Sequence, residues 1–278
     1  MRVRSCLLAG AVLLTVTAGV PTAHAADAVA CGDTITASTQ LTHDLACPAG
    51  AGLTVIASGT EEAPLVLDLN GHTISGAAEP GEPGVLIAGQ NFVVVRNGTV
   101  AGFHTGVEVQ QSTRVTLTGL TVQGVDRGVN VAGGGYHLIE KNDVTADQRD
   151  GIRLGATTNT LVARNDVHDA MWGISIGGYT TSNFVELNTV SNCVRHGIGA
   201  FDNVRAVAIV RNEVAGNAYG IFVGREVVEA RVELNEAKGN RDDDIRVDTD
   251  SAALIENATT GSDVPDPADV STADPTLD

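Results

Sequence analysis

Aromatic and basic residues are scarce in this chain of 278 residues. Aromatic side chains make up 3% of the residues, and 17 Lys and Arg stand against 34 Asp and Glu, for a formal net charge of -17 at pH 7. With so few aromatic rings, the core must be built from aliphatic side chains. A protein of this charge is repelled by nucleic acid and by anionic lipid. We therefore expect no nucleic-acid partner.

Long apolar runs are absent after the N-terminus. Residues 1–25 carry Arg2 and Arg4 ahead of an apolar run that ends in the small-residue sequence AHA, which is the plan of a secretory signal peptide. No later stretch approaches the ~20 apolar residues that a membrane-spanning helix needs. We therefore expect cleavage after Ala25 and a secreted, extracellular, monomeric protein that does not insert into membranes.

Cysteine is also rare, and three of the four residues lie beyond the predicted signal peptide. Cys31 and Cys47 lie close together in an exported segment, so we expect a disulfide that clamps the N-terminal end. We interpret Cys193 as a buried structural thiol. The seven His residues are scattered, and no dense acidic loop with ligand spacing is visible, so no metal site is expected. Calcium held by turn carboxylates is the one cofactor that the sequence leaves open.

What the sequence does contain is a unit that recurs about every 23 residues. Its first landmark is an asparagine that follows a hydrophobic run, at Asn97, Asn142, Asn165, Asn188, Asn212, Asn235 and Asn257. Its second landmark is a glycine, often in the pattern Gly-Ile-x-Ile, at Gly84, Gly106, Gly128, Gly151, Gly173, Gly197 and Gly220. Such a fixed period predicts a repeat architecture.

The unit has the pattern of short strands. In GIRLG, GISIG and GIFVG the apolar residues alternate, as in a strand with one buried face, and helical spacing is not sustained. We predict an all-β, single-domain parallel β-helix of about eight to nine coils, stacked ~4.8 Å apart. Residues 26–52 would form an N-terminal cap segment, residues 53–257 the β-helix, and residues 258–278 an acidic, disordered tail.

Stacking places equivalent residues of successive coils in columns. We expect the asparagine column to form a ladder of side-chain amides that hydrogen-bond to each other and to the backbone. The glycine column fits a positive backbone dihedral or a close backbone approach.

The repeats, together with CGDTITASTQLTHDLACP and LDLNGHTISG, resemble the right-handed parallel β-helix superfamily, the pectate-lyase-like proteins. They are also similar to secreted actinobacterial β-helix repeat proteins. The resemblance extends over about 200 residues, from Leu67 to the LIEN sequence at Leu254. The resemblance implies that the β-helix is right-handed. Because the superfamily includes polysaccharide lyases, hydrolases and mannuronan epimerases as well as proteins without activity, it implies a polysaccharide or glycan partner.

Two outward columns around the glycine are chemically varied where the rest of the chain is monotonous. The residue before the glycine is Thr105, Arg127, Asp150, Trp172, His196, Tyr219 and Asp243 in successive coils. Two places after it stand Glu108, Asn130, Arg153, Ser175, Gly199, Phe222 and Arg246. Gly155, Gly177 and Gly224 follow at the next outward position and are expected to leave room for a ligand.

The resemblance to mannuronan epimerases and β-helix lyases implies an acid and a base acting on a uronate ring. His196-Gly197 and Tyr219-Gly220 are similar to the His-Gly and Tyr-Gly steps of those epimerases. We hypothesise that Arg153 or Arg127 is the cation that neutralises the carboxylate, and that His196 is the base and Tyr219 the acid, or the reverse. The expected substrate-binding residues are Arg127, Asp150, Trp172, Glu108, Asn130 and Ser175.

Two other functions remain open. In a non-catalytic glycan-binding, cell-wall-binding or surface protein, His196 would cap a turn, Tyr219 and Trp172 would cover the edge of the core, and the charged residues would form an ion-pair ladder. In a glycoside hydrolase, Asp150 would work with a second carboxylate, from Asp147 or Asp169.

Overall fold

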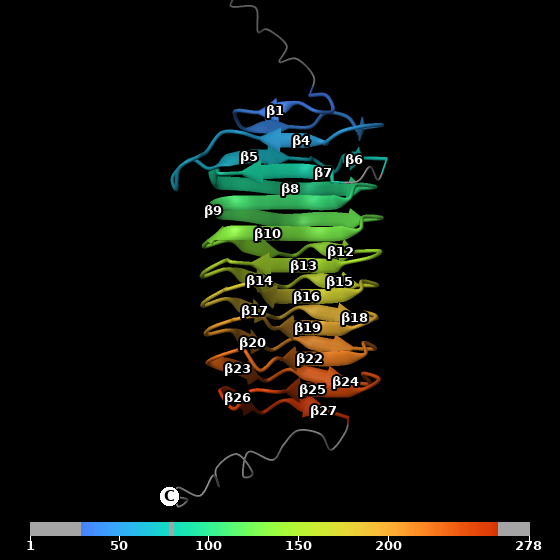
Figure 1. Ribbon diagram of the computed structural model, residues 1–278. Coiled ribbons are helices and arrows are strands. Elements are labelled where there is room, and N and C mark those ends of the chain that lie inside the picture. The colour runs from blue at the N-terminus through green and yellow to red at the C-terminus, as the bar shows by residue number, and fades with distance from the viewer. Residues whose placement is uncertain (1–28, 78–80, 261–278) are drawn as a thin grey trace, which may run out of the picture.

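The computed structural model describes residues 29–77 and 81–260. The predicted signal peptide, the start of the cap segment at residues 26–28 and the tail from residue 261 lie outside the described residues. Within them, every regular element is a strand. The strands stack into one elongated ladder (Figure 1). None of its elements is a helix that is long and apolar enough to cross a membrane.

Each coil contributes strands to three parallel sheets. Sheet 1 stacks ten strands in the described residues: β1 (Thr34–Ile35), β4 (Leu53–Val55), β7 (Pro83–Ala88), the start of β9 (Thr105–Gln123), β10 (Arg127–Gly135), β13 (Asp150–Gly155), β16 (Trp172–Gly177), β19 (His196–Ala200), β22 (Tyr219–Val223) and β25 (Asp243–Val247). The predicted all-β solenoid is confirmed. It has more coils than the eight to nine counted from the repeats, because the cap segment already supplies the first rung.

Sheets 2 and 3 follow sheet 1 around each coil. Sheet 2 contains β2 (Thr39–Gln40), β5 (Leu65–Asp68), the start of β8 (Asn91–Ala101), the middle of β9, β11 (Leu138–Glu140), β14 (Leu161–Ala163), β17 (Phe184–Glu186), β20 (Ala208–Val210), β23 (Ala230–Glu233) and β26 (Ala252–Ile255). Sheet 3 contains β3 (Leu45–Ala46), β6 (Thr73–Ser75), the ends of β8 and β9, β12 (Asp143–Thr145), β15 (Asp166–His168), β18 (Thr189–Ser191), β21 (Glu213–Ala215), β24 (Glu236–Lys238) and β27 (Ala258–Thr259).

The interior is a set of aliphatic columns. On sheet 1, Val129 pairs in register with Ile152, Ile152 with Ile174, and Ile174 with Ile198, and all four side chains are fully buried. Burying one such side chain contributes roughly 1.5–3 kcal/mol relative to leaving it exposed. The expected aliphatic core is thus present, and it fixes which side chains of each strand must point outward.

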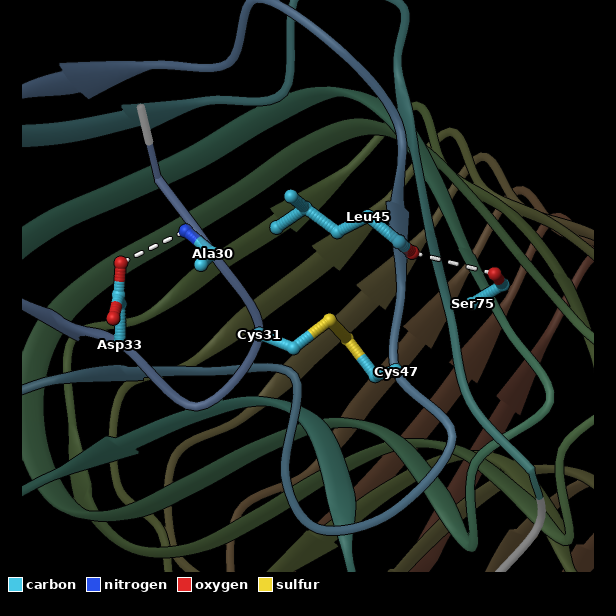
Figure 2. Close-up of a disulfide and its surroundings, with 6 residues drawn as sticks. All are labelled: Ala30, Cys31, Asp33, Leu45, Cys47 and Ser75. Atoms are coloured by element: carbon cyan, nitrogen blue, oxygen red, sulfur yellow. Dashed lines mark hydrogen bonds between the residues drawn. A yellow bond between two sulfur atoms is a disulfide. The ribbon is translucent and has the colours of Figure 1, made fainter. Parts of the chain in front are cut away.

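The N-terminal end is closed by the Cys31 to Cys47 disulfide, as predicted (Figure 2). Nearby, the hydroxyl of Ser75 donates a hydrogen bond to the Leu45 carbonyl at 3.3 Å, which ties the first coil to the second. The other thiol, Cys193, is buried, and burial raises its pKa to about 11. It is therefore protonated and unreactive, as its interpretation as a structural thiol requires.

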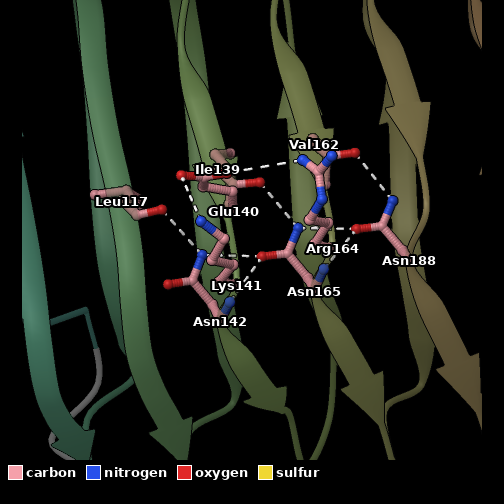
Figure 3. Close-up of polar contacts among 9 residues, drawn as sticks. All are labelled: Leu117, Ile139, Glu140, Lys141, Asn142, Val162, Arg164, Asn165 and Asn188. Atoms are coloured by element: carbon pink, nitrogen blue, oxygen red, sulfur yellow. Dashed lines mark hydrogen bonds and ion pairs between the residues drawn. The ribbon is translucent and has the colours of Figure 1, made fainter.

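The asparagine column forms the predicted ladder (Figure 3). The Asn165 amide donates to the Asn188 side-chain oxygen at 2.9 Å, and the same oxygen accepts the backbone N–H of Asn165 at 2.9 Å. The Asn165 amide also donates to the Ile139 carbonyl of the preceding coil at 2.9 Å. Because these side chains are buried, each rung satisfies polar groups that would otherwise be unpaired at the turn. A second, shorter ladder links Asn217 to Asn240 at 3.0 Å, and sequence reasoning missed it.

The glycine column is explained by close approach and not by a positive dihedral. A β-carbon at Gly151 would collide with the Val167 side chain and lie 2.9 Å from the Gly173 carbonyl oxygen. None of the seven glycines of this column has a positive φ. Of the two reasons that the sequence offered, tight packing is therefore the one that applies.

Candidate functional site

Sheet 1 brings the predicted catalytic pair together. His196 on β19 lies in register with Tyr219 on β22. Their aromatic rings, together with that of Phe222, form a cluster that we call the aromatic cluster. The His196 ring stacks on Phe222 with centroids 4.7 Å apart, and its centroid is 5.3 Å from that of Tyr219. The guanidinium carbon of Arg246, on the next coil, lies 5.9 Å from the Tyr219 ring centroid.

His196 is electrostatically unusual. Its Nδ1 atom is buried and has no hydrogen-bond partner in the part of the chain that the structure describes. Burial, and then the positive charges of Arg195 and Arg246, lower its pKa below the ordinary value for histidine. The imidazole is therefore neutral at neutral pH and able to accept a proton.

Two of the predicted substrate-binding residues instead bind each other. The Arg127 Nε atom lies 3.3 Å from a carboxylate oxygen of Asp150, and their side chains are only 13% and 11% exposed. This contact corresponds to the ion-pair alternative. It leaves neither Arg127 nor Asp150 with a free charge for a ligand, and it weakens the hydrolase alternative that needs Asp150.

Other predicted substrate-binding residues line two shallow hollows. The first, which we call the acidic hollow, has a volume of about 420 Å³ and is bordered by Glu82, Glu108 and Asn130. The second, which we call the Arg153 recess, has a volume of about 330 Å³ and is bordered by Asn130, Arg153 and Gly155. Because both hollows include Asn130, they adjoin along the face of sheet 1.

The structure separates Arg153 from the predicted acid and base. Arg153 pairs with Ser175, and Ser175 pairs with Gly199 in the His196 strand, so the two strands lie two rungs, or ~10 Å, apart. His196 lies three residues before Gly199, which adds ~10 Å along the strand. Ser175 is buried, and its hydroxyl has no partner in the described residues. Trp172 is half-buried beside Asp150.

The expectation that glycines leave open room holds at one position and fails at another. A β-carbon at Gly155 would meet nothing closer than 3.9 Å, so that rung is open. At Gly177 the Phe201 ring lies 3.3 Å from such a β-carbon, and at Gly199 it lies 3.1 Å away. Phe201 therefore covers this part of the face. It escaped sequence reasoning because it lies just beyond the end of β19.

A second histidine also escaped sequence reasoning. His104 Nδ1 is 3.0 Å from a carboxylate oxygen of Asp126, and His104 borders the acidic hollow. The two residues stand one place before the varied column, each immediately before the first residue of its strand, and this position is the signal that could have revealed them. Throughout residues 29–77 and 81–260, no three His, Cys, Asp or Glu side chains converge as metal ligands would. Calcium binding stays a prediction.

Comparison with known proteins identifies the family. The model of the right handed beta helix region matches residues 105–260, which is more than half of the chain, so the chain belongs to that family. No curated protein sequence matches.

Several solved structures share the fold. Pectate lyase Pel9A is 14% identical with a TM-score of 0.64, covering 83% of this chain and 72% of that chain. The periplasmic alginate epimerase AlgG is 13% identical with a TM-score of 0.58, covering 82% and 74%. The Dettilon tailspike protein gp208 is 18% identical with a TM-score of 0.58, covering 82% and 53%, so this chain spans about half its length. At such identities the likeness concerns the fold.

Proposed function

We propose that the protein is a secreted, carbohydrate-active β-helix that acts on a uronate-containing polysaccharide by proton abstraction. The observation that carries the proposal is the neutral, half-buried His196 beside Tyr219, on a face that leads through Ser175 to Arg153. The named activities of the pectate lyase and the alginate epimerase are of this reaction type, and they share the fold. The disulfide suits an exported protein.

In the proposed reaction a uronate sugar lies over Ser175 and Phe201. Arg153, which forms no ion pair in the described residues, donates hydrogen bonds to the sugar carboxylate and stabilises the negative charge that develops on it. His196 removes the proton on the carbon next to the carboxylate. In a lyase, Tyr219 protonates the departing glycosidic oxygen as its bond to carbon breaks, and a carbon–carbon double bond forms. In an epimerase, a proton returns to the opposite face of the same carbon.

A non-catalytic glycan-binding protein is the second candidate. It is favoured by the packing of His196 on Phe222 at 4.7 Å and by the Phe201 ring over Gly199, since both give these side chains a structural role. A hydrolase is less well supported, because Asp150 is engaged by Arg127 and Asp169 bonds to His168 at 2.8 Å.

The test is to incubate the purified protein with alginate, pectate, glucuronan and a glycosaminoglycan. A lyase produces an unsaturated sugar whose ultraviolet absorbance grows with time, and an epimerase changes the proton NMR spectrum without new ends. Reducing ends without absorbance would identify a hydrolase. If no polymer changes by any readout, the catalytic proposal is wrong.

Variants then test the assignment of the residues. His196→Ala and Tyr219→Phe should each lower kcat by about 10²–10⁴-fold, the usual contribution of a general acid or base. Thermal unfolding should stay close to wild type, because both rings are half-buried at the surface of the coil. As a matched control, His43→Ala removes an exposed histidine from the first coil and should leave kcat unchanged.

A further inference from the structure

The acidic hollow differs in charge from the Arg153 recess beside it. Arg127 and His104 border the hollow, but Asp150 pairs with Arg127 at 3.3 Å and Asp126 with His104 at 3.0 Å. Among residues 29–77 and 81–260, neither Glu82 nor Glu108 has an ion-pair partner. Uncompensated negative charge therefore remains in the hollow, whereas an unpaired cation stands in the recess.

The Glu108 carboxylate is held in place by two neighbouring amide side chains. One of its carboxylate oxygens accepts hydrogen bonds from the Asn130 amide at 2.8 Å and from the Gln110 amide at 3.2 Å. Asn130 is itself only 9% exposed, so the side chain that positions the carboxylate is fixed by packing. The second carboxylate oxygen has no partner in the described residues. A preorganised acceptor of this kind loses little side-chain entropy on binding.

The walls of the hollow suit a single sugar ring. Pro83 and Leu86 supply apolar surface beside the carboxylates, and a volume of about 420 Å³ lies in the range of small-ligand sites. A glycan lying along sheet 1 and bound at Arg153 continues over Asn130 toward Glu108, because these three residues are in register on successive strands.

We propose that the acidic hollow is a subsite for an amino sugar, whose ammonium group binds Glu108, and that the adjoining Arg153 recess binds a carboxylate-bearing sugar of the same chain. The inference rests on the proposed glycan-binding function of this face and specifies its substrate class as a glycan that contains both amino sugars and uronates. A polymer with a carboxylate on every sugar would place one against Glu108, where like charges repel.

The experiment compares three oligosaccharides of equal length by isothermal titration calorimetry. The first alternates glucosamine and glucuronate, the second is its N-acetylated form, and the third contains only galacturonate. Titrations use the wild-type protein and, to prevent turnover, the Tyr219→Phe variant. We expect the free amine to bind about tenfold more tightly than its N-acetylated form, which corresponds to about 1.4 kcal/mol. The galacturonate oligosaccharide should bind more weakly than the oligosaccharide that alternates glucosamine and glucuronate.

Variants test which residues cause the preference for the free amine. Glu108→Gln keeps the size of the side chain and should abolish the preference for the free amine, and Arg153→Gln should weaken the free and the N-acetylated forms alike. Glu213→Gln, an exposed glutamate on sheet 3, is the matched control and should change nothing.

The inference is overturned if the N-acetylated form binds as tightly as the free amine or more tightly, or if galacturonate binds most tightly. It is also overturned if the preference for the free amine survives Glu108→Gln, or if no probe binds. These results are separable from the proposed reaction. A protein that prefers the free amine but transforms no polymer refutes only the reaction, and a lyase active on galacturonate polymers without this preference refutes only the inference.

Discussion

Acid should destabilise this protein through one buried histidine. His137 lies in the turn before β11 and is buried, and its Nδ1 atom accepts the backbone N–H of Val115 at 3.3 Å. Burial lowers its pKa to about 4. Two coils further on, Asn183 occupies the same column, and its side-chain oxygen accepts the Thr160 N–H at 2.9 Å. His137→Asn should therefore keep this hydrogen bond and remove the titrating group.

The sign and size of the effect follow from the pKa of His137. An unfolded histidine titrates near pH 6.5. Between about pH 6.5 and about pH 4 the unfolded chain binds a proton that the folded protein does not, so the free energy of unfolding falls as the pH falls. The full loss, reached below the folded pKa, is at most about 3 kcal/mol. For a chain of this size, it corresponds to a difference in Tm of about 5–10 °C.

Circular dichroism during urea and thermal unfolding at pH 7.5 and pH 4.5 measures the loss. Carboxylates also titrate in this window, so the informative quantity is the difference between wild type and His137→Asn. We expect similar stability at pH 7.5 and a smaller acid-induced loss in the variant. His43→Asn, in an exposed turn, should behave like wild type. If wild type and His137→Asn lose equal stability on acidification, the reasoning is refuted.

Two further changes test the columns of the fold. Asn188→Ala should lower the free energy of unfolding, measured in urea, by about 3–5 kcal/mol, because it leaves buried donors and a carbonyl of the neighbouring coils without hydrogen-bond partners. A loss below about 1 kcal/mol would contradict a buried ladder. His168 titrates in the opposite sense to His137, since hydrogen bonds to Asp169 and then Asp143 raise its pKa. Its stabilisation is complete below pH 6.5 and is lost as pH rises through the raised pKa. His168→Gln should therefore lose less stability than wild type between pH 6 and pH 9, by a small amount because the His168 side chain is only partly buried.

The period of the repeat made backbone positions predictable. Once Gly197 and Gly220 are aligned, His196 and Tyr219 must be neighbours on adjacent strands, and the structure places them so. The same alignment stacks Asn165 on Asn188 and leaves their amides no acceptor other than each other and the backbone. These inferences needed only register, which a solenoid of constant coil length preserves.

Side-chain directions were not predictable in the same way. The pairing of Arg127 with Asp150 depends on how two long side chains bend across one rung, and the sequence offered it only as an alternative. The Phe201 ring covers Gly177 and Gly199 from beyond the strand end, where turn length varies between coils. His104 was missed because its column repeats no motif, although the Asp126 carboxylate on the next coil holds its ring.

The spacing of the coils also limits which charges can stack. Neighbouring rungs are ~4.8 Å apart, so equal charges in register repel unless a third group intervenes. On sheet 3, Asp143 is in register with Asp166, and the His168 ring lies 3.1 Å from Asp143, where its protonated form compensates the two negative charges. On sheet 1, Asn130 separates Glu108 from Arg153, and the chain itself supplies neither of them with a counter-charge in the described residues. The Glu108 carboxylate and the Arg153 guanidinium are separated by a neutral amide on an outward face, and neither has an ion-pair partner in the described residues. This arrangement matches a ligand whose own charges alternate in sign.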